Sequence, residues 1–325
     1  MPRNIRGLTL GLTLLTSALP AIAFAQGLPP LEQKDSYRVG FAQTESNNPW
    51  RIAETQSMRD VADECGWELV YTDAAGSAAK QVADVNSMIA QGVDAIFLAP
   101  REETPLIPAV MNAKEAGIPV FLIDRNVNQS VAQAGEDYVT FIGSDFIDQG
   151  RRAAEWLVAE TGGEATIIEL EGTTGSSPAN DRKKGFDDVI AEHPGMEIVA
   201  SQSGDFSRDQ GREVMATLLQ AHPDVTAVYA HNDEMAIGAI AALEAAGRTP
   251  GEDVTIVSID GTRDALQAII DGKLGATVQS SPFFGPISCE TMQRYAAGEE
   301  IEPWVKIEDM FFDASNAAEH IDEAY

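Results

Sequence analysis

The sequence predicts an α/β protein with two doubly wound lobes, each built on a parallel sheet. Short apolar runs alternate with helical segments along most of the 325 residues. Many of these runs are continuously apolar, which is typical of parallel strands covered by helices on both faces. Segments 93–125 and 225–261 also repeat one order: strand, polar loop, helix ending in Ala-Gly, and strand ending in Ile-Asp. This repeat predicts two similar lobes more strongly than chain length alone.

Ten strands follow from the apolar runs. In the first half we expect strands at 37–42, 67–72, 93–99, 118–124 and 138–143. In the second half we expect them at 165–170, 196–203, 225–230, 254–259 and 274–279. Helices are expected between the strands. Gln81 and Gln210 begin helices at corresponding positions of the two repeated units. Asn48-Pro49 and Ser177-Pro178 each read as an N-cap residue followed by proline at the first helical position.

The first 25 residues read as an export signal. Arg3 and Arg6 form a basic start, an apolar run follows at 8–19, and Ala23-Phe24-Ala25 is a small-x-small cleavage site. A membrane anchor is the alternative, but spanning a bilayer takes roughly 20 apolar residues. We therefore expect cleavage after Ala25 and a protein located in the periplasm without direct insertion in the membrane.

The charge of the chain excludes two classes of partner. Asp and Glu total 51 against 22 Lys and Arg, so the formal net charge is -29. Nucleic acids and anionic lipid surfaces would be repelled, because they bind basic faces. Disorder is excluded by the 44% hydrophobic content and its periodic placement. One hypothesis for the acidity is adaptation to a salty medium, where screening relieves self-repulsion.

Neither the cysteines nor the histidines form a motif of known chemistry. Cys65 and Cys289 each lie on an apolar helical stripe, and the residues alone slightly favour buried thiols over a disulfide, although an exported protein permits one. The four histidines are scattered, and neither C-x-x-C nor H-E-x-x-H occurs. We therefore expect no metal site and no cofactor.

Polar and aromatic side chains follow the carboxyl ends of the expected strands, where open parallel sheets bind ligands. The candidates for ligand binding are Asn47, Trp50, Arg51, Asp124, Arg125, Asn180, Arg182, Phe206, Asn232, Asp260 and Gln279. Arg51 is the most informative, because a cation in the first turn of a helix opposes the helix dipole. A local ion pair would explain Arg125 more simply, and ordinary core packing would explain Trp50 or Phe206.

Taken together, these side chains suit a polyhydroxyl ligand. Carboxylates accept hydrogen bonds from hydroxyls, arginines and amides donate them, and an aromatic ring covers the apolar face of a sugar. Three arginines against Asp124 and Asp260 give a pocket of about one positive charge, which disfavours a polyamine. The two carboxylates could also be a glycosidase pair, but neighbouring arginines should keep both ionised, and a general acid must be protonated.

Longer motifs resemble those of the periplasmic sugar-binding proteins of ABC transporters, in their type I or ribose-binding group. The resemblance runs from about 37 to 325 and is closest to the galactofuranose-binding members. Its most specific segments are NPWR at 48–51, QGVDAIFLAP at 91–100, NDRKKGF at 180–186, SQSGDFSR at 201–208, YAHNDEMAIGAI at 229–240 and SIDG at 258–261. Asn47 departs from the acidic residue expected of the galactofuranose-binding members at that position.

The resemblance implies two lobes that close on one sugar, with three crossings near Gly143, Gln279 and Lys306. The first lobe would comprise 36–142 plus 280–306, and the second 143–279 plus 307–325. It also implies sugar contacts by Trp50, Arg51, Asp124, Arg125, Arg182, Asn232 and Asp260, with Phe206 and Gln279 as further contacts. The helix carrying Cys289 would then return to the first lobe, which makes its pairing with Cys65 geometrically possible.

The resulting prediction is a monomeric, non-enzymatic binding component of an ABC sugar importer. It would deliver a monosaccharide, galactofuranose or a related pentose or hexose furanose, to a permease. A receptor for a non-sugar signal that feeds a chemoreceptor or sensor kinase is an alternative, and a hydrolase is a weaker one. A repressor core shares the architecture, but the export signal argues against it.

Overall fold

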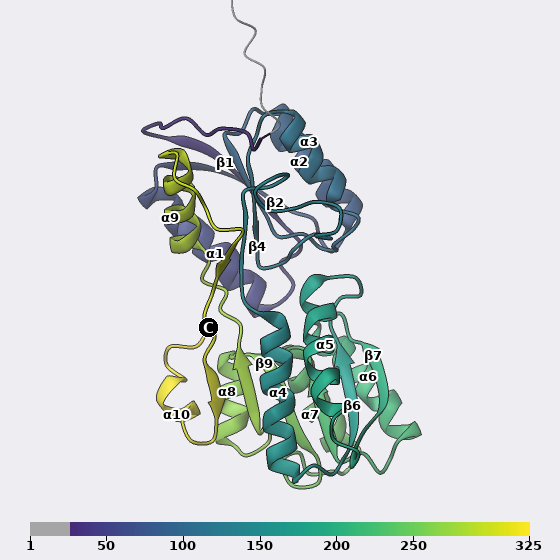
Figure 1. The fold of residues 1–325 in the computed structure, drawn as a ribbon. Helices are drawn as coiled ribbons and strands as arrows, with labels where there is room; N and C mark the ends of the chain where they lie inside the picture. The colour runs from purple at the N-terminus through teal and green to yellow at the C-terminus, as the bar shows by residue number, and fades with distance from the viewer. Residues whose placement is uncertain (1–26) are drawn as a thin grey trace, which may run out of the picture.

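The structure is a computed structural model that describes residues 27–325, and it has two lobes joined by several chain segments (Figure 1). The expected cleavage after Ala25 and the rest of the export signal lie outside the described residues. Among the described residues, no helix combines the length and apolar character needed to cross a membrane.

Each lobe contains a six-stranded sheet, and the two sheets have equivalent strand orders. The first has the order β11-β5-β4-β3-β1-β2 and consists of β1 (Tyr37–Gln43), β2 (Trp67–Asp73), β3 (Ala95–Leu98), β4 (Val120–Ile123), β5 (Thr140–Gly143) and β11 (Trp304–Lys306). The second has the order β12-β10-β9-β8-β6-β7 and consists of β6 (Ala165–Glu171), β7 (Met196–Ser203), β8 (Ala227–Ala230), β9 (Thr255–Asp260), β10 (Ala276–Gln279) and β12 (Phe311–Asp313). Only β12 pairs antiparallel.

Helices cover both faces of each sheet. In the first lobe, α1 and α9 pack on one face and α2 and α3 on the other. In the second, α4 and α5 pack on one face, and α6, α7 and α8 on the other. The helices are α1 (Pro49–Glu64), α2 (Ala78–Ala90), α3 (Ile107–Glu115), α4 (Phe146–Thr161), α5 (Ser177–Ile190), α6 (Arg208–Ala221), α7 (Asp233–Ala245), α8 (Arg263–Ile270), α9 (Gly285–Ala296) and α10 (Ala317–His320).

The predicted α/β class and the repeated lobe are confirmed, because all ten expected strands occur and the two strand orders match. Strands β11 and β12 were not predicted. Each has three residues, too few for a hydrophobic pattern to show. Helix α5 also begins one residue earlier than expected, with Ser176 as its N-cap residue. The hydroxyl of Ser177 instead accepts a hydrogen bond from the Asn126 amide of the other lobe, at 2.8 Å.

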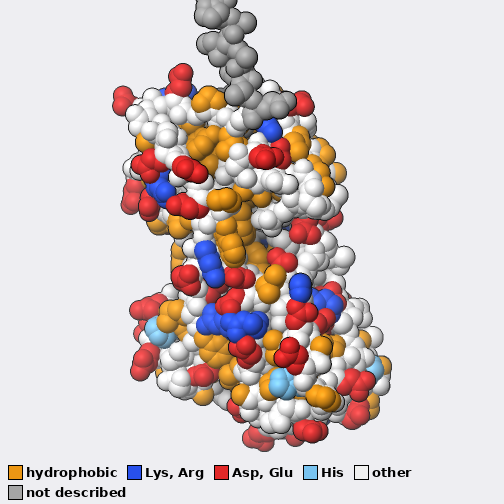
Figure 2. Space-filling view, viewed as in Figure 1, with side chains coloured by type: hydrophobic (Ala, Val, Ile, Leu, Met, Phe, Trp, Pro, Cys, Tyr) orange, Lys and Arg blue, Asp and Glu red, His pale blue; other side chains and the backbone are white. Residues whose placement is uncertain are grey.

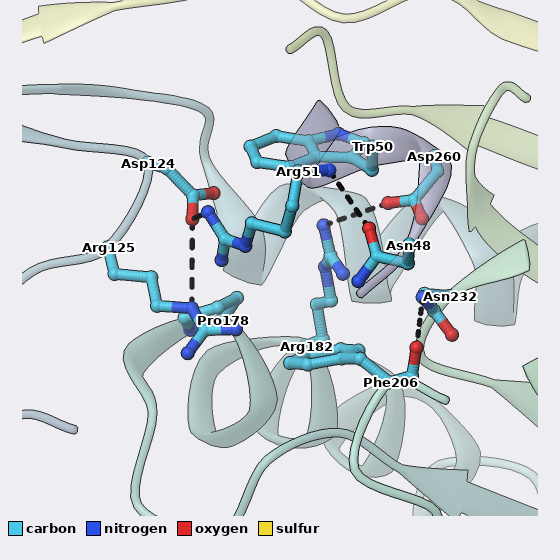
Figure 3. A pocket seen from close by; sticks show the side chains of 10 residues that line it. All are labelled: Asn48, Trp50, Arg51, Asp124, Arg125, Pro178, Arg182, Phe206, Asn232 and Asp260. Carbon is cyan, nitrogen blue, oxygen red and sulfur yellow. Dashed lines mark hydrogen bonds and ion pairs between the residues drawn. The ribbon is translucent and has the colours of Figure 1, made fainter. Parts of the chain in front are cut away.

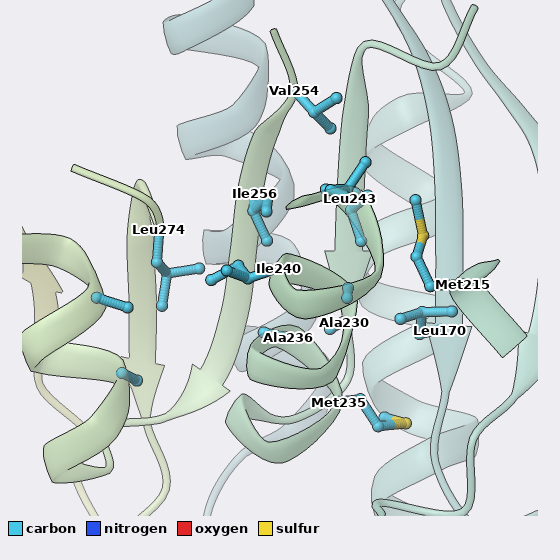
Figure 4. Close-up of a cluster of buried hydrophobic side chains, with 14 of the residues drawn as sticks. Leu170, Met215, Ala230, Met235, Ala236, Ile240, Leu243, Val254, Ile256 and Leu274 are labelled. Carbon is cyan, nitrogen blue, oxygen red and sulfur yellow. The ribbon is translucent and has the colours of Figure 1, made fainter. Parts of the chain in front are cut away.

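Continuous apolar strands produce the cores on which these layers depend. In the second lobe, Leu170, Ala230 and Ile256 from three strands pack against Met235 and Leu243 of α7, as Figure 4 shows. All five are fully buried. Burial on both faces explains why the strand runs are apolar rather than alternating, and it holds the polar strand ends at a fixed edge.

The chain passes between the two sheets three times. It runs from β5 into α4, from β10 into α9, and from β11 into β12. The last described residues also lie between the lobes, where Figure 1 marks the end of the chain. Three connections restrict the lobes to hinge-like motions, because any displacement must be absorbed by all of them together.

Helix α9 is held against α1 by a disulfide between Cys289 and Cys65, whose Cα atoms are 6.2 Å apart. The sequence-based preference for free thiols is therefore wrong. Apolar stripes could not show that α9, 224 residues further along the chain, returns to the first lobe. At the other end of α9, Gly285 lies so close to α1 that a Cβ atom would stand 2.1 Å from the Ser57 carbonyl oxygen.

We expect replacement of both cysteines by serine to lower the free energy of unfolding by roughly 2–4 kcal/mol, because the link restricts the unfolded chain. Urea denaturation of the variant and the wild type measures this difference. A reductant should destabilise the wild type and leave the double variant unchanged. Equal unfolding of the wild type with and without reductant would contradict the prediction.

Candidate functional site

A pocket lies where the carboxyl edges of the two sheets face each other (Figure 3). From the first lobe, α1 contributes Trp50 and Arg51, and the end of β4 contributes Asp124 and Arg125. From the second lobe come side chains of α5, of the β7–α6 loop, and of the ends of β8 and β9. The full lining is Asn48, Trp50, Arg51, Asp124, Arg125, Pro178, Arg182, Phe206, Asn232 and Asp260. The empty space among these side chains, open solvent at the mouth included, is about 340 Å³.

Eight of the predicted residues line this pocket, and three lie elsewhere. Asn47 is exposed and accepts a hydrogen bond from Asn48 at 3.1 Å. Asn180 is exposed and donates to Glu103 Oε2 at 2.7 Å. Gln279 lies at the second crossing, where its side-chain oxygen accepts from the Met310 amide at 3.0 Å. Asn47 follows β1, Asn180 lies on α5 and Gln279 ends β10, as expected, but none of the three side chains lines the pocket.

Two lining residues were missing from the predicted set. Asn48 caps α1 by accepting from the Arg51 amide at 2.9 Å, and Pro178 lies in the first turn of α5. The signal for both was present in the sequence, since each belongs to a helix start at a strand's carboxyl end. Helix starts at that edge necessarily lie beside the ligand, so capping residues there were candidates as well.

Arg51 is anchored by two carboxylates. Its Nη1 atom donates to Glu54 Oε2 at 2.7 Å and lies 2.7 Å from Asp124 Oδ2, although only the Glu54 contact is aligned as a hydrogen bond. The guanidinium also lies 4.7 Å from the centre of the Trp50 ring. The Trp50 indole in turn donates to the Ser280 carbonyl at 2.7 Å, which links the pocket to the second crossing.

Arg125 is buried with incomplete hydrogen bonding. Its Nη1 atom donates to the Arg101 carbonyl at 3.0 Å, and its Nε atom is 3.6 Å from Asp124 Oδ2. Among the described residues, Nε has no hydrogen-bond partner. Burial and the nearby Arg51 lower the pKa of Arg125 to about 9, so it stays charged at neutral pH. A buried donor without a partner costs about 1–3 kcal/mol, and a ligand hydroxyl in the pocket would remove that cost.

Arg182 is the cationic side chain that the second lobe contributes to the pocket lining. It donates from Nε to Gln149 at 2.9 Å and from Nη1 to the His231 carbonyl at 2.7 Å. Its Nη2 atom lies 3.8 Å from Asp260 Oδ1, too far for a direct hydrogen bond. The space between them leaves both groups available to a ligand. Asn232, which caps α7, donates to the Phe206 carbonyl at 3.2 Å and so fixes the loop that carries the Phe206 ring.

Several residues at the pocket have backbone conformations that non-glycine residues rarely adopt. Asp124 has φ 58°, Phe206 φ 56° and Asp260 φ 142°. Each such conformation costs on the order of 1–3 kcal/mol and is concentrated in proteins at sites that hold ligands. In these conformations all three side chains line the pocket between the lobes.

The lobes also touch directly beside the pocket. Arg101 bridges Glu45 of its own lobe, at 2.8 Å, and Asp205 of the other, at 3.1 Å. The Glu103 amide donates to the Gly175 carbonyl at 2.9 Å. With the Asn126 to Ser177 and Asn180 to Glu103 hydrogen bonds already described, these contacts hold the two lobes in a closed arrangement.

Burial, rather than the neighbouring arginines, dominates the pKa of Asp260. Burial raises its pKa well above the ordinary value, and Arg182 only partly opposes this. Burial also raises the pKa of the adjacent buried Asp233 to about 6, although Ser258, Thr262 and Thr277 donate to it. At 3.8 Å, Arg182 does not make the close hydrogen bond that would offset the desolvation of Asp260.

Metal chemistry has no support in the described part of the chain, where no three His, Cys, Asp or Glu side chains gather into a site for an ion. The acidic side chains instead spread over both lobes on the face that Figure 2 shows. The pocket itself combines hydrogen-bond donors, acceptors and aromatic rings without a large excess of either charge.

Comparison with known proteins agrees with this geometry. Residues 39–300 match a family described as periplasmic binding protein domain. The galactofuranose-binding protein of Escherichia coli (strain K12) is 41% identical over 79% of this chain and 81% of that protein. The binding component of the arabinose ABC transporter from Shewanella sp. ANA-3, solved with α- and β-L-arabinofuranose, has a TM-score of 0.84 and 39% identity over 88% of this chain and 95% of that chain. A Mycobacterium smegmatis structure in complex with β-D-fucofuranose has a TM-score of 0.84 and 41% identity, covering 88% and 94%.

We expect the protein to lose stability as pH rises from about 4 to about 7. The pKa of Asp233 is higher in the folded chain, at about 6, than in the unfolded chain, at about 4. Between these values the folded state binds more protons than the unfolded state, so the free energy of unfolding falls with rising pH. Thermal unfolding at several pH values, in about 0.5 M salt to screen the net charge, measures this slope.

Asp233→Asn is the matched variant for this measurement, because it keeps the shape and removes the titrating group. Over the same pH range, the free energy of unfolding should fall by about 1–3 kcal/mol less in the variant than in the wild type. An identical slope in the variant and the wild type would show that Asp233 does not contribute.

Proposed function

This chain belongs to the periplasmic binding protein domain family, and from that premise we propose that it is the solute-binding component of an ABC sugar importer. It holds one monosaccharide between its lobes. The observation that carries the proposal is the buried pocket between two sheet edges, with three arginines, two aspartates and two aromatic rings. These groups match the hydroxyls and the apolar face of a sugar.

The unfilled hydrogen-bonding capacity of the pocket supports a polyhydroxyl ligand. Arg125 Nε lacks a partner, and Arg182 and Asp260 stand 3.8 Å apart. A hydroxyl donates and accepts at once, so it can lie between a guanidinium and a carboxylate and satisfy both. Hydrogen bonds to charged groups contribute about 1.5–3 kcal/mol each, and a few of them suffice for tight binding of a neutral sugar.

We propose that the sugar is bound in its furanose form. The relatives described above are named for galactofuranose, or were solved with arabinofuranose or fucofuranose. Binding closes the hinge, because only the closed arrangement lets residues of both lobes contact one ligand. The lobes in this proposal are 36–142 plus 280–306 and 143–279 plus 307–325.

The same proposal includes the cellular setting. The protein is a periplasmic monomer that is cleaved after Ala25 and delivers its sugar to a membrane permease. It has no catalytic turnover, and this is supported by relatives named as binding proteins. Incubation of the protein with glycosides, followed by product analysis, tests the last point, and turnover lost in Asp260→Asn would overturn it.

A panel of monosaccharides should identify the ligand by thermal shift. A ligand of the folded state at about 100 times its Kd adds about 2.7 kcal/mol to the free energy of unfolding. We expect arabinose or galactose to raise Tm, and polyols, uronic acids and amino acids to have smaller effects. A shift only with a non-sugar compound would contradict the proposal and favour a receptor for another signal.

Replacement of a charged pocket residue should weaken sugar binding without unfolding the protein. We expect Arg51→Ala and Asp260→Asn each to weaken sugar affinity at least about 30-fold, because each removes a charged hydrogen bond of roughly 2 kcal/mol or more. Asp260→Asn should also preserve or increase Tm, since a buried carboxyl with a raised pKa is lost.

Asn47→Ala is the matched control, because Asn47 lies in the loop just before α1, which carries Trp50 and Arg51, but is exposed outside the pocket. Calorimetric titration should give this variant wild-type affinity. Wild-type affinity in Arg51→Ala would contradict the proposed pocket.

A further inference from the structure

Glu54 is a fully buried carboxylate behind the pocket, and the pocket chemistry above does not account for it. It lies one turn after Arg51 on α1 and is 0% exposed. It does not line the pocket, so it cannot be a direct contact of a ligand in this arrangement. Burying a carboxylate is costly unless it is paired, and the partners of Glu54 therefore show what it does.

Within the described residues, every hydrogen bond of the Glu54 side chain uses the same oxygen. Its Oε2 atom accepts from Arg51 Nη1 at 2.7 Å and from Gln43 Nε2 at 2.8 Å. Gln43, at the end of β1, is itself fixed because its side-chain oxygen accepts from the Thr44 amide at 2.8 Å. The Oε1 atom has no hydrogen-bond partner among the described residues. Glu54 is thus held rigidly at the cost of one unsatisfied oxygen, which is a poor arrangement if its only purpose were stability.

Glu54 and Asp124 compete for the same nitrogen. Arg51 Nη1 is 2.7 Å from Asp124 Oδ2 and also 2.7 Å from Glu54 Oε2, and it is aligned as a hydrogen bond only toward Glu54. Without the pull of Glu54, the guanidinium would be free to turn onto Asp124 and form the paired hydrogen bonds that arginine and carboxylate prefer. That ion pair would occupy the acceptor atoms of Asp124 that face the pocket.

Glu54 also changes the charge that a ligand meets. The lining has three arginines and two aspartates, which leaves one formal positive charge in excess. Burial raises the pKa of Glu54 to about 7, so above that pH its carboxylate, directly behind Arg51, is ionised and cancels that excess. Charges at this depth interact more strongly than they do in water, so the difference between a neutral and a positive pocket matters for an anionic ligand.

We infer that Glu54 is a positioning and specificity residue: it keeps the Arg51 hydrogen bond aligned on its own carboxylate rather than on Asp124, and when ionised it offsets the excess positive charge of the pocket, so that a neutral sugar is preferred to its uronic acid. The inference rests on the proposed function, since it concerns the ligand of the same pocket. It assigns the choice between the two sugar classes to a residue that does not contact the sugar.

The variant Glu54→Gln tests this role with D-galactose and D-galacturonate as probes, which differ only at C6. Calorimetric titration at low salt and at about pH 8, above the pKa of about 7 to which burial raises Glu54, gives both affinities for the full chain. We expect the variant to bind galactose about tenfold more weakly, because Arg51 turns onto Asp124. We also expect its affinity for galacturonate relative to galactose to rise about tenfold or more, because the pocket gains a positive charge.

A purely structural role for Glu54 makes a different prediction. It would weaken both sugars equally and lower Tm, whereas the proposed role shifts their ratio and leaves Tm unchanged or higher. An unchanged ratio in Glu54→Gln would overturn the inference. If the wild type binds no neutral monosaccharide at all, the proposed function fails instead, so the two failures are distinguishable.

Glu45→Gln is the matched control. Glu45 is also buried in the first lobe, pairs with an arginine through one oxygen, and has its other oxygen unpartnered. Its partner is Arg101, however, and neither residue lines the pocket. The ratio of the two affinities should change by less than about threefold in Glu45→Gln, since Glu45 is hydrogen-bonded to Arg101 and not to an arginine of the pocket lining. A shift as large as that of Glu54→Gln would show a general field effect and refute the specific role of Glu54.

Discussion

The burial of three arginines between two sheet edges is the constraint on which this site depends. A buried guanidinium is stable only when oxygen atoms surround it, and the chain supplies them from the backbone as well as from carboxylates. Arg125 is held by the Arg101 carbonyl and Arg182 by the His231 carbonyl. Because these carbonyls carry no net charge, the pocket aspartates keep hydrogen-bonding capacity for a ligand. The fold therefore creates a site whose side chains are charged, buried and incompletely hydrogen-bonded.

That site exists only where the two lobes meet. Parallel strands bring helix starts and polar loops to one edge of each sheet, and the three connecting segments hold the two edges opposite each other. Trp50 links its ring in the pocket to the Ser280 carbonyl at the second crossing, so ligand contact and hinge geometry share a residue. The disulfide between Cys65 and Cys289 fixes α9, the helix that follows this crossing, to α1. Because the first lobe is rigid, the lobes can close only by motion at the three connecting segments, and not by rearrangement within the lobe.

The chain as a whole is strongly acidic, whereas the pocket contains nearly equal numbers of positive and negative side chains. The formal charge of -29 is carried largely by side chains outside the pocket, where water and salt screen it. Inside, the ionised carboxylate of Glu54 offsets the one positive charge in excess. Its Oε2 atom accepts a hydrogen bond from Arg51, and its Oε1 atom has no partner among the described residues. Such an arrangement is expected where selectivity for the ligand, rather than stability of the fold, has determined the residue.

The sequence by itself determined the α/β class, the ten strands β1 to β10, the repeated lobe and most of the pocket, because continuous apolar runs and polar strand ends are local patterns. It could not show β11 and β12, whose three residues carry no period. It also could not decide the disulfide, which depends on α9 returning across 224 residues. Asn47, Asn180 and Gln279 follow the right elements, yet only the tertiary structure decided that their side chains turn away. Glu54 was invisible for the same reason: its role depends on which atoms surround Arg51, and burial between distant segments is a property of the packed chain.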